Sequence, residues 1–243
     1  MAVPSVNNVL GAFANNNTAT LTGYVPTSGA NSKLVVVIGR ESTSNRTVSG
    51  IDYGTTALAR VATQELDTGT FDNLCEIWYL DNPLGAHASG NIVVTYSGGT
   101  GDSHVLACTV LGVETGGGVT AVTTTSATSP ISASITTAVN DSLVMSGHIS
   151  GQVINPAATS PHSEDIETDS GTGTCNMGHT NVAVAAATTV EWTVSGTNRS
   201  VLCLVAWGPS AAAGGGRVMG SLAGLGGLAG AGGLAGIGGG LAA

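Results

Sequence analysis

The sequence predicts an all-β protein: an antiparallel β-sandwich or jelly roll, followed by an extended Gly/Leu/Ala repeat tail. Charged residues make up only 9% of the chain, hydrophobic residues make up 42%, and 37 of the 243 residues are glycine. Short runs of β-branched residues with alternating polarity recur between turn residues from Thr18 to Trp207. No window has the apolar spacing of an amphipathic helix, and the Glu, Lys, Arg and Gln that cover helix faces are scarce.

Strands are expected in twelve segments of the chain. Each strand of an antiparallel sheet has one face to bury and one face to expose, so many short strands joined by turns favour sheets packed face to face. The segments are residues 18–25, 33–39, 46–51, 58–62, 73–80, 91–96, 104–113, 132–138, 142–146, 181–186, 190–194 and 200–207.

Two segments of the chain echo each other. Residues 94–98 (VTYSG) lead into residues 103–108 (SHVLAC), and residues 193–196 (TVSG) lead into residues 200–203 (SVLC). We interpret each as a β-hairpin whose second strand is central and covered on both faces. The echo predicts two related halves that meet near residues 116–125, within one sandwich domain spanning residues 1–210.

A family resemblance rests on the order of four motifs. They are NSKLVVV (31–37), GIDYGTTAL (50–58), EIWYLDNP (76–83) and NIVVT (91–95), and the series closes on residues 201–208. This order resembles a β-sandwich module common in phage structural proteins and bacterial surface proteins, over residues 18–209. The resemblance implies a jelly-roll-like or lectin-like fold and a role in assemblies or adhesion, with no catalytic residues to carry over.

The C-terminus has a different composition. Residues 211–219 are expected to be a flexible linker, and residues 220–243 repeat a Gly-Leu-Ala-Gly-x-Gly pattern with glycine at every third position. A helix would lose about 1 kcal/mol per glycine, and a strand would scatter the leucines over both faces. A polyproline-II helix, with about three residues per turn, matches the period. The repeat resembles the polyglycine-II arrays of phage tail adhesins and, more loosely, collagen, from which it departs in lacking proline.

The repeat predicts self-association. A lone polyproline-II strand makes no internal hydrogen bonds, so an ordered tail needs neighbours. We therefore expect a homo-oligomer, with a trimer as the simplest choice, and the alternative is a disordered low-complexity tail. The residues expected at the contacts are Leu222, Leu225, Leu228, Leu234 and Ile237 on the apolar edge and Gly224, Gly227, Gly230, Gly233 and Gly236 on the glycine edge.

Charge and cysteine usage narrow the function classes. The formal net charge is −9 with six basic residues, so no patch is expected to neutralise nucleic-acid phosphates. The N-terminus lacks the pattern of a signal peptide, and glycine makes the tail a poor membrane span. Cys75, Cys108 and Cys203 lie in apolar runs and are expected to be buried free thiols, whereas Cys175 falls in a predicted polar loop where it can be exposed.

An acidic segment is the main candidate for a metal site. Glu164, Asp165, Glu167 and Asp169 fall in one expected loop and are weak calcium candidates, although a solvated acidic loop is the favoured interpretation. A zinc site made by His162, Cys175 and His179 is weaker still, because no second close ligand pair accompanies them. No cofactor is predicted.

Other chemistry is not expected either. Residues 101–104 (GDSH) share Gly-Asp-Ser with one lipase class, but they fall in an expected β-hairpin rather than at a strand-to-helix turn. Four aromatic residues are interpreted as core packing rather than as a glycan-stacking platform. They are Trp78, Tyr79, Trp192 and Trp207. We therefore do not expect an enzyme. A glycosidase is the less favoured interpretation, because so few carboxylates are present.

Together these features predict a virion structural protein. Its expected role is that of a capsid decoration (cement) or fibre subunit on the particle surface, with copies of itself and other virion proteins as partners. The alternative is a carbohydrate-binding adhesin or lectin-like surface module, whose partners would be glycans. Neither nucleic acid nor a membrane is an expected partner.

Overall fold

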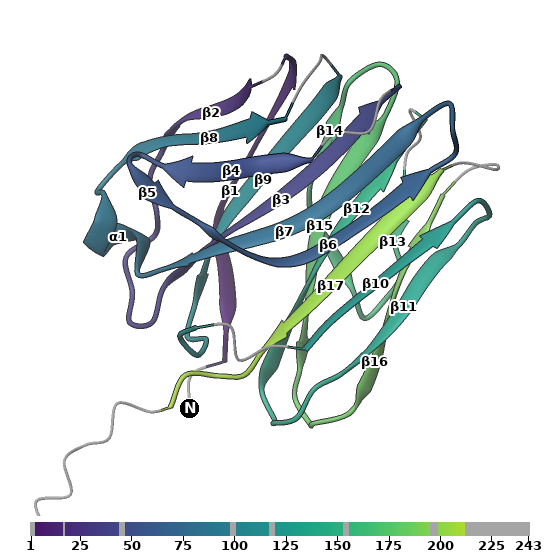
Figure 1. Cartoon of the computed structure of the whole chain (residues 1–243). Coiled ribbons are helices and arrows are strands. Elements are labelled where there is room, and N and C mark those ends of the chain that lie inside the picture. Colours follow the sequence, from purple (N-terminus) through teal and green to yellow (C-terminus); the bar gives the residue numbers. More distant parts are fainter. Residues whose placement is uncertain are drawn as a thin grey trace, which may run out of the picture. The chain divides into compact units, whose positions relative to one another are not determined.

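The structure is a computed structural model, and it describes residues 3–16, 18–43, 47–97, 101–116, 120–152, 156–194 and 199–211 (Figure 1). These residues fold almost entirely into antiparallel strands, with one turn of helix, α1 (Pro83–Ala86). The predicted all-β class is therefore confirmed, and the antiparallel sheets are consistent with the predicted sandwich. The contact residues predicted in the tail, from Leu222 to Ile237, lie outside the described residues, as does most of the predicted linker.

The strands belong to two consecutive parts of the chain. The first half contains β1 (Ser5–Asn15), β2 (Thr18–Tyr24), β3 (Lys33–Ser42), β4 (Val48–Tyr53), β5 (Thr56–Ala57), β6 (Ala59–Asp67), β7 (Asp72–Asp81), β8 (Gly90–Tyr96) and β9 (Asp102–Leu111). The second half contains β10 (Thr120–Ser126), β11 (Ile131–Thr136), β12 (Ser142–Ser150), β13 (Ala157–Ala158), β14 (Ser163–Asp169), β15 (Thr174–Val182), β16 (Ala187–Thr193) and β17 (Ser200–Trp207).

The described strands form four sheets. The first central sheet has the order β1-β9-β3-β7-β6, and the first outer sheet has the order β2-β8-β4-β5. The second central sheet has the order β10-β17-β12-β15-β14, and the second outer sheet has the order β11-β16-β13. Each sheet draws its strands from one half of the chain only.

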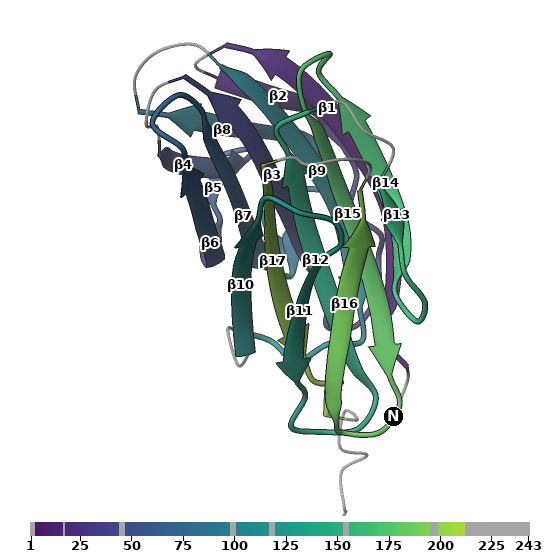
Figure 2. The same cartoon turned by 90° about the vertical axis from the view of Figure 1, so that its right-hand side faces the viewer.

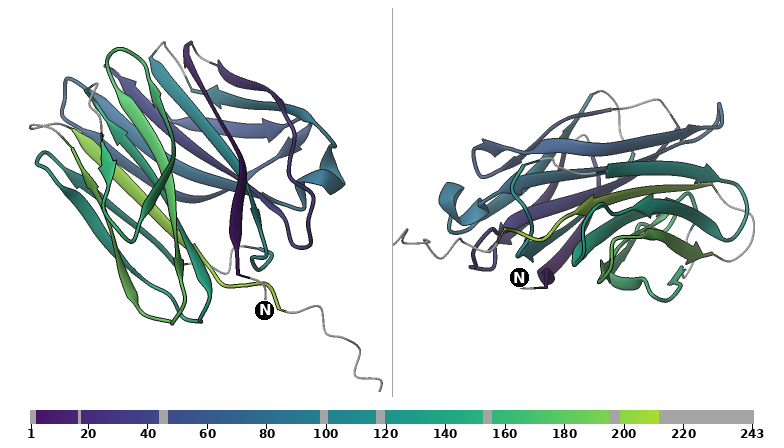
Figure 3. Two further views of the ribbon diagram at one scale, coloured as in Figure 1. Left: turned by 180° about the vertical axis from the view of Figure 1, so that it is seen from behind. Right: turned by 90° about the horizontal axis from the view of Figure 1, so that it is seen from below.

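The sheets are stacked in layers, as Figures 2 and 3 show from three sides. One apolar cluster fills the space between the first outer and first central sheets, and another fills the space between the second central and second outer sheets. A third cluster joins the two central sheets. Strands in the middle of the central sheets are therefore covered on both faces, which explains the unbroken apolar run of β3, where Leu34 to Ile38 are fully buried.

Both halves have the same connectivity. If β5 and β6 are counted as one bent fifth strand, each central sheet has the order first, eighth, third, sixth, fifth, and each outer sheet contains the second, seventh and fourth strands. A β-bulge repeats as well. It lies between Arg60 and Ala62 in the β6–β7 ladder and between Glu164 and Ile166 in the β14–β15 ladder.

The bulge aligns the two halves residue by residue. It makes Ile77 of β7 equivalent to Met177 of β15, because each lies opposite the residue that follows the bulge. The ladders carry this alignment to Val37 and Gly147 and then to β9 and β17, where positions 106 and 203 correspond. The same register aligns Ser103 of β9 with Ser200 of β17, the residues that begin the second parts of the echoed sequences, so the structural repeat and the sequence repeat agree at these strands.

The central sheets pack through a pseudo-two-fold interface. β1 contacts β14 just as β10 contacts β6, β15 contacts β3 just as β7 contacts β12, and β3 contacts β12 at the middle. At the centre of this interface, residues at equivalent positions of the two halves face each other, but their side chains differ in size. A Cβ added to Gly39 would lie 3.1 Å from Cδ1 of Ile149, and one added to Gly147 would lie 2.6 Å from Cγ1 of Val37. A large side chain of each half thus fills the space left by a glycine of the other.

Several sequence predictions are wrong. The echoed segments are not hairpins: β8 and β9 belong to different sheets, and so do β16 and β17. Turn residues mark a change of direction, and they do not tell a tight turn from a crossing between sheets. The predicted strand at 181–186 largely misses β15, and β1, β10 and β14 were not predicted. In the part of the chain that the structure describes, no helix is long and apolar enough to cross a membrane.

Candidate binding site between the two halves

A cavity of about 270 Å³ opens where the two halves meet at one end of the central sheets. The first half supplies the ends of β1 and β3, the start of β9 and the turn between β6 and β7, and the second half supplies the turn between β14 and β15. We call this cavity the seam pocket. It is lined by Asn15, Glu41, Ser42, Thr43, Phe71, Gly101, Asp102 and Thr172.

Strand alternation aims two carboxylates at this seam. Val37 of β3 packs between the central sheets, so Glu41, four residues further along, lies on the same face. Leu106 of β9 also packs there, which places Asp102 on that face. Both carboxylates are largely covered, with 6% of Glu41 and 8% of Asp102 exposed.

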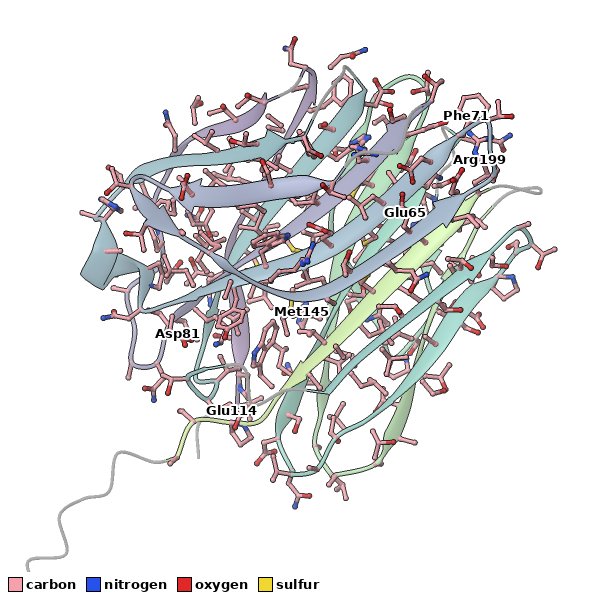
Figure 4. The ribbon with its side chains drawn as sticks, in the orientation of Figure 1. Glu65, Phe71, Asp81, Glu114, Met145 and Arg199 are labelled. Atoms are coloured by element: carbon pink, nitrogen blue, oxygen red, sulfur yellow. The ribbon has the colours of Figure 1, made fainter. Side chains whose placement is uncertain are left out.

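Arg199 joins the two halves behind the pocket. Its Nη2 donates to Oε1 of Glu41 at 2.5 Å and to the carbonyl oxygen of Gly151 at 2.6 Å. The guanidinium carbon lies 4.0 Å from the centroid of the Phe71 ring, so a cation–π contact holds the ring at the pocket wall (Figure 4). Arg199 thus fixes an acidic side chain and an aromatic side chain in one place.

Acidic side chains outnumber basic ones at the pocket. Burial raises the pKa of Glu41, the positive charge of Arg199 opposes this shift, and the charge of Asp102 reinforces it. Oε2 of Glu41 has no hydrogen-bond partner among the described residues. Thr172 donates its hydroxyl to Oδ2 of Asp102. Two carboxylates and one guanidinium leave the site with an excess of one negative charge.

The acidic segment proposed for calcium is the edge strand β14 rather than a loop, which corrects the prediction. Glu164 and Glu167 both accept from Nδ2 of Asn176, at 3.0 and 2.9 Å. Asp165 accepts instead from His179, and Asp169 accepts from the hydroxyl of Thr174. The four carboxylates are therefore divided among three partners. Within the described residues, no group of three or more His, Cys, Asp or Glu side chains is arranged to hold a metal ion.

The equivalent position in the first half shows the opposite charge pattern. Glu76, which corresponds to Asn176, accepts from Nη1 of Arg60 at 2.9 Å and from the hydroxyl of Thr63 at 3.1 Å. Its other oxygen accepts from the indole of Trp78 at 2.7 Å. The edge strand thus supplies a cation to a buried acid in one half, and it supplies acids to a buried amide in the other.

The structure separates the residues proposed for zinc. Cys175 is fully buried in β15 between the central sheets, so the prediction that it lies in a polar loop is wrong. His162 lies with Nε2 2.7 Å from Oγ of Ser146 and packs edge-on against Trp192. His179 pairs with Asp165. The sequence around Cys175 did not indicate burial, because Thr, Asn, Gly and His residues are mixed with Cys and Met in this strand.

The thiols and most of the aromatic rings belong to the core. All four cysteines are free and buried, as predicted for Cys75, Cys108 and Cys203. Burial raises the pKa of the Cys108 and Cys175 thiols well above the ordinary value, which makes them poor nucleophiles. The core role predicted for Trp78, Trp192 and Trp207 is confirmed, whereas Tyr79 is half-buried.

The GDSH segment begins a strand rather than forming a turn. Asp102 lines the seam pocket, and Ser103 and His104 are buried along β9. Sequence reasoning missed Glu41 and Arg199 as site residues. Their only signal was a charged residue directly beside a long apolar run.

Comparison of the chain with protein-family models, with curated protein sequences and with solved structures found no match.

Proposed function

We propose that this chain is a structural subunit of a virion or comparable particle surface, and that each half is a jelly roll. The single observation that supports this most is the repeated strand order. An eight-stranded jelly roll places its first, eighth, third and sixth strands in one sheet and its second, seventh and fourth strands in the other. Jelly rolls of this kind build viral capsid and lectin domains.

The packing of the halves favours a structural role. The central sheets bury one continuous apolar cluster between them, and the outer sheets cover their other faces. Such a stack is a rigid block, because close-packed interiors transmit force with little deformation. A rigid block that presents its outer sheets, its edge strands and its strand ends suits a subunit that works by contact with neighbours.

Location tests the proposal directly. An antibody raised against the purified protein should label sedimented particles in electron micrographs, and quantitative mass spectrometry should find a fixed copy number relative to the other particle proteins. Recovery of the protein only in the supernatant, with no fixed ratio to any particle protein, would rule the proposal out.

Self-association is a separate part of the proposal. It rests on the glycine and leucine periods of residues 220–243, which lie outside the described residues. Removing these residues should leave the sandwich folded and reduce the oligomer size measured by light scattering. An unchanged oligomer size would remove the tail from the mechanism of assembly and leave the particle assignment standing.

The alternative, a carbohydrate-binding surface module, is favoured by a different observation. The seam pocket joins carboxylate, hydroxyl and amide groups to an aromatic ring in one cavity. This alternative is compatible with a particle-surface location, since attachment to a host is itself a surface function.

A further inference from the structure

We propose that the seam pocket binds a single neutral sugar residue through adjacent hydroxyl groups. The proposal rests on the alternative function above, a carbohydrate-binding module, which it makes more specific, and it does not depend on the structural role. Ligand sites occur preferentially at the boundaries between packed units, and this cavity lies between the two halves. Its volume of about 270 Å³ is slightly smaller than the cavities that hold drug-sized ligands, so one ring fits better than an extended chain.

The lining groups match the chemistry of a polyol. Asp102 can accept from two neighbouring hydroxyl groups, because an ionised carboxylate has two oxygens and about four acceptor positions. Only Oδ2 of Asp102 has a described protein donor, Thr172. The amide of Asn15, at the mouth of the pocket, can donate to a ring or hydroxyl oxygen. Phe71 adds apolar surface for the C–H face of a sugar.

Glu41 makes one wall of the pocket acidic. It lines the pocket, it is 94% buried, and its Oε2 has no hydrogen-bond partner among the described residues. This oxygen is itself buried, so a ligand in the cavity would meet Glu41 through its negative charge rather than through a hydrogen bond to Oε2.

Electrostatics restrict the class of sugar. Glu41 and Asp102 are two acids, and Arg199, the nearby base, already binds Glu41 and the backbone of Gly151. An anionic sugar would bring a third carboxylate into this partly buried site, where like charges repel more strongly than in water. We therefore expect neutral hexoses to bind and sialic acid to be excluded.

The two halves also differ in chemistry at the pocket. The register of the repeat makes Arg199 the equivalent of Asp102, and Gly151 the equivalent of Glu41. The middle of the interface is apolar in both halves, whereas this end carries acids in one half and a base or glycine in the other. The pseudo-two-fold symmetry is therefore broken at the pocket, as the recognition of a single asymmetric ligand requires.

The test uses the intact protein and three probes, methyl α-mannoside, methyl β-galactoside and the methyl glycoside of N-acetylneuraminic acid, followed by NMR chemical-shift titration. At least one neutral glycoside should bind, and the sialoside should not. Asp102→Asn removes the charge from the main acceptor and keeps its shape, so affinity should fall about tenfold or more. Asn15→Ala changes an exposed side chain and should weaken binding with no change in the melting temperature.

The matched control is Glu191→Gln. Glu191 lines a separate surface cavity of about 440 Å³ on the second half, so its loss should leave the titration unchanged. Three results would overturn the proposal: no shift with either neutral glycoside, affinity that survives both Asp102→Asn and Asn15→Ala, or equal binding of the sialoside. Because Asn15→Ala leaves the core untouched, the test holds even if Asp102→Asn weakens the fold.

Discussion

Gly39 shows how closely single residues fit at the centre of the molecule. A Cβ at this position would lie 2.4 Å from Sγ and 2.9 Å from Cβ of Cys175, so even one methyl group forces the two central sheets apart. Both contacts are to the opposite half of the chain. The glycine is therefore needed for close approach between the sheets rather than for a turn.

Gly39→Ala should accordingly destabilise the protein by about 1–3 kcal/mol, the usual cost of overpacking a close-packed core. Urea unfolding followed by circular dichroism measures this. Gly50→Ala is the matched control: it is also a strand glycine, and a Cβ there would have nothing within 4 Å. The control should stay within about 0.5 kcal/mol of the unsubstituted protein. Equal losses in the two variants would contradict the packing argument.

The burial of His148 makes the folding stability depend on pH. Burial lowers the pKa of His148 to about 4, partly opposed by its hydrogen bond to Asn176. The unfolded chain keeps a histidine pKa near 6.5, so between about pH 6.5 and 4 the unfolded state binds more protons than the folded state. The contribution of neutral His148 to stability is therefore complete above pH 6.5 and is lost as the pH falls.

A His148→Gln variant isolates this contribution. Glutamine cannot take up a proton, so the stability of the variant relative to the unsubstituted protein should improve by about 2 kcal/mol between pH 7.5 and pH 5. The measurement is urea unfolding of both proteins at the two pH values. A constant difference would mean that His148 titrates alike in the folded and unfolded states.

Among the elements, most central strands were predictable, with β15 as an exception, and the edge strands β1, β10 and β14 were not. β3, β9 and β17 are long apolar runs, because neighbouring sheets cover both of their faces. β1 and β14 lie at sheet edges, where Asn-rich or acidic sequence is compatible with a strand but does not predict one. Edge strands depend on a partner for their structure, and the partner is fixed by tertiary packing.

Equivalent edge positions offer a matched pair of substitutions. Arg60 supplies the cation to Glu76, which is 1% exposed, whereas Glu164 is one of two acids that share the amide of Asn176. Arg60→Ala should cost about 1–3 kcal/mol, because it leaves a buried carboxylate without its strongest donor.

Glu164→Ala should stay within about 0.5 kcal/mol of the unsubstituted protein, because Glu167 still accepts from the same amide. Thermal unfolding of the two variants side by side gives the comparison. An equal loss of stability in Glu164→Ala and Arg60→Ala would contradict this, because the two edge residues would then stabilise the protein equally despite their opposite charges.

For the whole molecule, composition and the alternation of apolar and polar residues were enough to predict the class of fold, whereas the seam pocket depends on the topology of the sheets. The seam pocket takes residues from positions 15, 41–43, 71, 101–102 and 172, which no local pattern connects. The pairing of β9 with both β1 and β3, together with the packing of one central sheet on the other, brings them together. The repeat itself left a trace in the sequence, although the echoed segments proved to be crossings between sheets rather than hairpins.

The unequal fit at the pseudo-two-fold axis predicts how the halves choose partners. Val37 faces Gly147 and Ile149 faces Gly39, and each of these pairs joins equivalent positions. Two copies of the first half would set valine against valine and leave a gap between glycines. Two copies of the second half would set isoleucine against isoleucine beside a similar gap. Only the unlike pair fills the space, since overlaps and voids both destabilise a core.

Dividing the chain after Gly116, between β9 and β10, tests this. The two pieces, produced together in one cell, should associate in a one-to-one complex detected by native mass spectrometry, and they should do so in preference to pairs of like pieces. Exchanging the central side chains in the first piece, with Val37→Gly and Gly39→Ile, should weaken the mixed complex, because glycine would then face Gly147 and isoleucine would overlap both Ile149 and Cys175. If the centre of the interface does not select partners, the two substitutions should leave the ratio of mixed complex to like pairs unchanged. Selectivity would then have to arise elsewhere, for example at the charged end where Arg199 meets Glu41.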